Sequence, residues 1–79
     1  MRDTQPPITS AAEYHGYQQA YETMTLLVAE REQRLFIALA NGDSKIIEDR
    51  RAELLHVLRR REGIIDAIKV YEQLQKQSA

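Results

Sequence analysis

The chain has 79 residues, no Cys, no Trp and a formal net charge of −1. This length allows one small domain, and the lack of Cys excludes both a disulfide framework and a thiolate metal site. No apolar run approaches the roughly 18 residues that a membrane span needs, and no signal peptide opens the chain. We therefore expect a cytoplasmic protein that does not bind membranes.

The first ten residues are polar and contain Pro6 and Pro7. Proline lacks the amide donor and restrains the residue before it, so residues 1–10 are predicted to form a flexible, extended arm. Ser10 and Glu13 have the spacing of a capping box. We expect the Ser10 hydroxyl to accept from the Glu13 amide and the Glu13 side chain to return to Ser10. A helix is therefore predicted to begin at residue 11.

Two long helices are predicted, over about 11–40 and 45–75, with a turn at 41–44. The first has apolar and aromatic residues at alternating spacings of three and four, which is the pattern of a helical seam. Its members are Tyr14, Tyr17, Tyr21, Met24, Val28, Leu35 and Ala38, with Arg31 as the one interruption. Gly42 can end this helix in a left-handed conformation, and Asp43 or Ser44 can cap the next. The fold class is thus all-α, an antiparallel hairpin over residues 11–77.

One hairpin cannot hide all the apolar side chains of these helices. The first helix contains the runs 26–29 and 35–40, which place apolar groups on nearly every side. The second carries apolar neighbours in pairs, such as Ile46-Ile47 and Leu54-Leu55. Small chains often complete their core by association. We therefore predict a homodimer that forms a four-helix bundle; the alternative is a different partner protein on the spare surface.

An antiparallel hairpin with this turn places residues whose numbers sum to about 85 side by side. Tyr14, Tyr17 and Tyr21 should then meet Tyr71, Ile68 and Ile64 at the open end of the hairpin. Tyrosine is common at interfaces because its ring packs while its hydroxyl stays wet. Two interpretations stay open for the four tyrosines: an aromatic plug that closes the bundle, or a partner-binding surface over which residues 6–8 fold.

The sequence contains no recognisable arrangement of catalytic residues. His15 and His56 lie on different predicted helices, and no phosphate-binding glycine loop or activated nucleophile is present. Glu53 and His56 share a helix face, but a metal site in a bundle core needs further inward carboxylates. We predict no catalytic residue, no metal, no cofactor and no enzymatic activity; a metal or catalytic bundle built on Glu53 and His56 is the least favoured hypothesis.

Arginines on the second helix provide an alternative function. Residues 45–62 contain six basic and four acidic residues, a net charge of +2, whereas residues 11–40 have a net charge of −2. Arg50, Arg51, Arg59 and Arg60 are therefore the candidate nucleic-acid contacts. Domains that bind DNA unaided are usually clearly basic, and adjacent helical residues point about 100° apart. A nucleic-acid-associated regulatory or packaging accessory is thus the alternative to a protein-binding module.

Both ends of the hairpin resemble a known arrangement. Ile8, Ser10, Glu13 and Tyr14 fit an I-x-[ST]-x-x-E-Y helix start, and residues 68–72 fit an I-x-x-Y-E finish. Together they resemble the helical hairpin before the DNA-binding domain of HigA-type antitoxins and related Xre-like regulators. No helix-turn-helix follows here, so the resemblance implies an oligomerising, partner-binding accessory. Small phage proteins that inhibit a host protein are similar in size.

Overall fold

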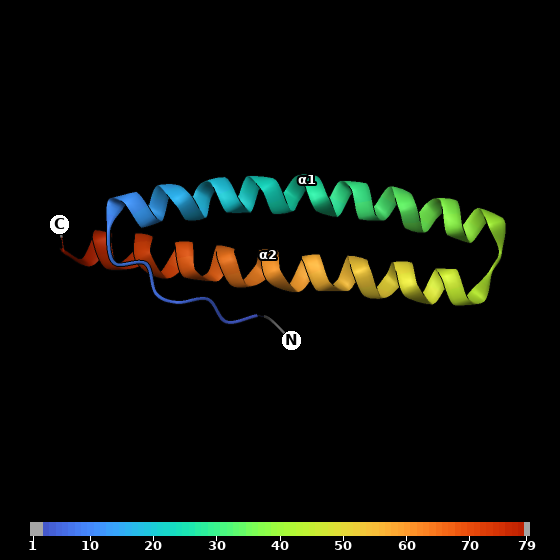
Figure 1. Cartoon of the computed structure of the whole chain (residues 1–79). Helices are drawn as coiled ribbons and strands as arrows, with labels where there is room; N and C mark the ends of the chain where they lie inside the picture. Colours follow the sequence, from blue (N-terminus) through green and yellow to red (C-terminus); the bar gives the residue numbers. More distant parts are fainter. Residues whose placement is uncertain (1–2, 79) are drawn as a thin grey trace.

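The structure is a computed structural model that describes residues 3–78 of the chain. Two helices, α1 (Ala11–Asn41) and α2 (Ser44–Ser78), run antiparallel and form a rod with extents of 54 × 20 × 15 Å (Figure 1). The described residues contain no strand. The predicted all-α hairpin is confirmed. Of the predicted arm, Met1 and Arg2 lie outside the described residues.

The start of α1 has the predicted cap. The Glu13 amide donates to the Ser10 hydroxyl at 3.2 Å. The Glu13 carboxylate reaches one residue further back than expected, and accepts from the Thr9 hydroxyl at 2.5 Å and the Thr9 amide at 2.8 Å. Because these bonds favour the ionised carboxylate, the pKa of Glu13 lies below its ordinary value, with the Thr9 hydroxyl as the largest cause.

The turn between the helices has the predicted chemistry. Gly42 adopts φ 78°, and its amide donates to the Ala38 carbonyl at 3.0 Å, which ends α1. The Asp43 carboxylate accepts from the amides of Lys45 and Ile46 at 3.1 and 3.3 Å, so Asp43 caps α2. The sequence offered Asp43 or Ser44 as the cap of the second helix, and in the structure Asp43 is the cap. α1 ends one residue later than expected, and α2 continues to Ser78.

The seam between the helices has the expected register. The ring centroids of Tyr14 and Tyr71 are 4.9 Å apart. Arg34 of α1 lies 3.7 Å from Glu53 of α2, further along the same seam. The core along this seam is thin, because no described side chain is fully shielded from solvent. The buried hydrophobic residues are Ile8, Val28, Ala38, Val57, Ile64 and Ile68.

The N-terminal arm forms neither helix nor strand over residues 3–9. It lies against α2 and runs back along the hairpin from the start of α1 (Figure 1). Ile8 anchors it, since this side chain is only 7% exposed and packs with Ile64 and Ile68. The arm therefore contributes to the core at the open end of the hairpin. Across residues 3–78, neither helix is both long and apolar enough to cross a membrane.

Candidate functional site

The four tyrosines lie together at the open end, as the register predicts. Each is half-buried, and each packs against the core cluster of Ile8, Ile64 and Ile68. Tyr14 and Tyr71 stack at a tilt of 32°, and the Arg61 guanidinium lies 6.0 Å from the Tyr21 ring centroid. The rings thus have a packing role in the hairpin, as an aromatic plug would; their use as a partner-binding surface stays a prediction.

Two of the tyrosine hydroxyls have defined partners. The Tyr14 hydroxyl donates to the Glu72 carboxylate at 2.5 Å. This bond holds the proton on the phenol and raises the pKa of Tyr14, with partial desolvation as a smaller cause. The Tyr17 hydroxyl donates to the Pro6 carbonyl at 2.8 Å. Tyr17 therefore holds the arm, which agrees with the expectation that residues 6–8 fold over the tyrosines.

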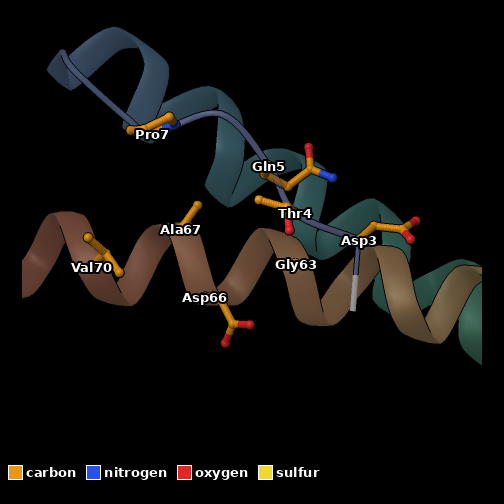
Figure 2. A pocket seen from close by; sticks show the side chains of 8 residues that line it. All are labelled: Asp3, Thr4, Gln5, Pro7, Gly63, Asp66, Ala67 and Val70. Atoms are coloured by element: carbon orange, nitrogen blue, oxygen red, sulfur yellow. The ribbon is translucent and has the colours of Figure 1, made fainter. Parts of the chain in front are cut away.

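A groove holds the arm along the side of the hairpin. Between the arm and α2 there remains an open hollow of about 240 Å³ (Figure 2). It is lined by Asp3, Thr4, Gln5 and Pro7 from the arm and by Gly63, Asp66, Ala67 and Val70 from α2. Figure 2 shows the arm passing directly over the α2 backbone at Gly63. The Asp3 amide also donates to the Arg59 carbonyl, at 3.4 Å.

Gly63 is the functional feature that sequence reasoning missed. A Cβ at this position would collide with the Asp3 carbonyl oxygen, so any larger residue would push the arm away. In the sequence it is an isolated glycine inside the second predicted helix. Glycine inside a helix costs about 1 kcal/mol relative to alanine, and glycine is the usual residue where another part of the chain approaches the backbone closely. That signal could have located the arm.

A second surface lies on the half of the hairpin near the turn. Leu26, Phe36 and Ile37 of α1 are 73, 65 and 57% exposed. Leu26 and Ile37 are eleven residues apart, which is three helical turns, so they share the outer side of α1. We name Leu26, Phe36 and Ile37 the turn-proximal surface, because their positions fall within about 100° of one another around α1. Five other large hydrophobic side chains are exposed in the described chain, and they lie on other sides of the helices or at the open end: Leu39, Ile46, Leu55, Val70 and Leu74.

The candidate arginines are not brought into a single stripe. Arg50 is half-buried and pairs with Glu53 at 2.9 Å. Arg51, Arg59 and Arg60 are exposed, but their positions on α2 place them on different sides of the helix. Arg60 also lines a second hollow, next to Gln5 and Tyr17 on the arm side of the hairpin. Contact with nucleic acid through these residues stays a prediction.

Glu53 and His56 do not build a metal site with other residues. Glu53 lies between two guanidiniums, with Arg50 on one carboxylate oxygen and Arg34 at 3.7 Å from the other. The second oxygen is buried without a hydrogen bond, so the Arg34 charge is what offsets its desolvation. Over residues 3–78, no group of three or more His, Cys, Asp or Glu side chains is placed to hold a metal ion. Glu53 therefore belongs to an ion-pair network.

Comparison with known proteins finds no matching family model, no similar curated protein and no similar solved structure. The resemblance to the hairpin of HigA-type antitoxins thus stays a prediction. Conclusions about function rest on the open-end groove and the turn-proximal surface.

Proposed function

We propose that this chain is a non-enzymatic protein-interaction module that pairs with a second copy through the turn-proximal surface. The paired hairpins form a four-helix bundle, and the open ends remain available to a partner protein that the dimer binds and regulates. The observation that carries the proposal is the exposure of Leu26, Phe36 and Ile37, at 73, 65 and 57%. Their burial would contribute about 25 cal/mol for each Å² of apolar area removed from water.

The thin core of the single hairpin supports association. No described side chain is fully shielded, and on the half near the turn the hairpin buries Val28, Ala38 and Val57. The open end is better filled, since the arm and the tyrosines cover Ile64 and Ile68. The half that the arm does not cover thus has more of the exposed large hydrophobic side chains, six of the eight in the described chain. A second copy packed there supplies the missing half of the core.

Size-exclusion chromatography with light scattering tests the dimer. We expect the wild-type chain to have twice the 9.2 kDa monomer mass at micromolar concentration. The double variant Phe36→Gln with Ile37→Gln should be a monomer, because it removes apolar area while keeping good helix formers. The matched control is Val70→Gln with Leu74→Gln, which alters equally exposed residues at the opposite end and should remain a dimer.

A clean wild-type monomer at micromolar concentration would sink the proposed dimer. Equal loss of the dimer in the two double variants would show that general surface hydrophobicity, and not the turn-proximal surface, drives association. Circular dichroism on the same samples ensures that each variant keeps its helices.

A further inference from the structure

The arm lies in its groove as a bound peptide would. Its side chains are mostly exposed, and Ile8 alone enters the core, between Ile64 and Ile68. Two hydrogen bonds fix its backbone to the helices: Tyr17 to the Pro6 carbonyl at 2.8 Å, and the Asp3 amide to the Arg59 carbonyl at 3.4 Å. The seat therefore consists of one aliphatic pocket and two backbone contacts.

The groove contacts main-chain atoms of the arm more than side-chain atoms of the arm. Gly63 lets the Asp3 carbonyl approach α2 more closely than any side chain would allow. Tyr17 and Arg59 contact main-chain atoms of the arm. Such contacts suit an extended segment, and proline keeps a segment extended before it binds, which lowers the entropy cost of binding. The only side chain that must fit is the branched aliphatic one after the prolines.

We propose that this groove binds an extended Pro-Pro-aliphatic segment of a partner protein, and that the arm is the resident ligand which this segment displaces. The inference rests on the proposed protein-binding function and names the chemistry of the partner. The key groove residues are Tyr17, Gly63, Ile64 and Ile68. The Arg59 carbonyl accepts from the main chain of the arm, and Arg60 lines a hollow with Gln5.

The arm can be displaced because its hold is small. Over residues 3–8, the arm is held by the buried Ile8 side chain and by two hydrogen bonds to its main chain, one of them long, and a competing segment would replace these contacts. The hollow of about 240 Å³ next to Pro7, Ala67 and Val70 remains unfilled by the arm. A partner segment with larger side chains at these positions would fill it and gain contacts that the arm lacks.

Peptide binding to the full chain tests the inference. The probe is a fluorescent peptide with the sequence of residues 3–10, followed by anisotropy. The chain with Ile8→Asp keeps every groove residue but loses its own anchor, so we expect it to bind the probe. The wild-type chain should bind at least ~10-fold more weakly, since its tethered arm competes at a millimolar effective concentration. A probe with Asp in place of its Ile is the matched control and should not bind.

A receptor control locates the binding in the groove. Adding Gly63→Ala to the Ile8→Asp chain strengthens the helix but blocks the close approach, and we expect probe binding to be lost. If Ile8→Asp lowers the helix content, Ile8→Ala takes its place with the same expected order of affinities. Equal probe affinity of the wild-type and Ile8 variants, or binding that survives Gly63→Ala, would overturn the inference, as would no binding to a folded Ile8 variant.

The dimer and the groove can fail separately. Adding Ile8→Asp to the Phe36 and Ile37 double variant leaves every groove residue in place, so probe binding by this monomeric chain would support the groove without the dimer. If the wild-type chain is a dimer but the folded Ile8 variants do not bind the probe, the result would support association through the turn-proximal surface and contradict peptide binding in the groove.

Discussion

At the scale of single residues, two glycines with the same helical propensity have different surroundings. Gly16 has open space around it, whereas a Cβ on Gly63 would collide with Asp3. Gly16→Ala should raise the free energy of unfolding by about 1 kcal/mol, which for a chain of this size is about 4–8 °C in Tm. Gly63→Ala should raise the free energy of unfolding by less than Gly16→Ala does, or should lower it, because the added Cβ pushes the arm away from α2. Thermal unfolding followed by circular dichroism measures both; equal gains would mean that the arm does not rest on Gly63.

Because of the hydrogen bond from Tyr14 to Glu72, we expect the free energy of unfolding to fall as the pH rises in the alkaline range. The pKa of Tyr14 is raised in the folded chain, so the folded state holds this proton more tightly than the unfolded state does. The bond therefore contributes fully below about pH 10, the ordinary phenol pKa. Its contribution is lost as the pH rises through the raised value. Titration of tyrosinate absorbance should show one late-titrating tyrosine, which Tyr14→Phe removes; a Tyr14→Phe chain with an unchanged titration tail would contradict the assignment.

At the scale of elements, the tight turn at Gly42 sets the antiparallel pairing of α1 and α2. Its φ of 78° is in the left-handed region, which costs a side-chain-bearing residue roughly 1–2 kcal/mol. Gly42→Ala should therefore destabilise the hairpin by about 1 kcal/mol, and Gly42→Asn by less, because asparagine tolerates this conformation. Urea unfolding measures the difference. Equal effects of the two substitutions would show that the turn does not require the left-handed conformation.

The arm is the element for which the sequence was least informative. Pro6 and Pro7 predict an extended backbone, and residues 3–9 form neither helix nor strand. Local propensity does not predict the path that such a segment takes over the helices. That path depends on contacts with residues more than fifty positions away, such as Ile64. By contrast, the caps at Ser10 and Gly42 depend on neighbours within four residues, and the sequence predicts both.

At the scale of the whole molecule, association should make stability depend on concentration. If two hairpins share a core through the turn-proximal surface, Tm rises with protein concentration, because association stabilises the folded chains by mass action. The double variant Phe36→Gln with Ile37→Gln should remove this dependence, and Val70→Gln with Leu74→Gln should keep it. Thermal scans over a hundredfold range of concentration decide the matter, and a wild-type Tm that stays constant over that range would contradict the dimer.

The two proposed functions, self-association and partner binding, lie at opposite ends of the rod. The turn-proximal half carries the exposed Leu26, Phe36 and Ile37, and the open end carries the tyrosines and the arm. Self-association at one end leaves the groove at the other end accessible. Under these two proposals, one small hairpin would pair with its copy and hold a partner segment at the same time.

The sequence by itself determined the two helices, their caps, the turn and the pairing of Tyr14 with Tyr71. These features depend on a periodicity of three and four and on side chains a few residues apart, which any window of the chain contains. The sequence offered residues 6–8 a place over the tyrosines, but only the tertiary structure showed that the arm continues over Gly63 and that Glu53 is held by arginines from both helices. It also assigned Tyr17 to the arm and left the turn-proximal side chains exposed. Such outcomes depend on which distant surfaces meet, because burial and close approach are properties of two packed elements and not of either one.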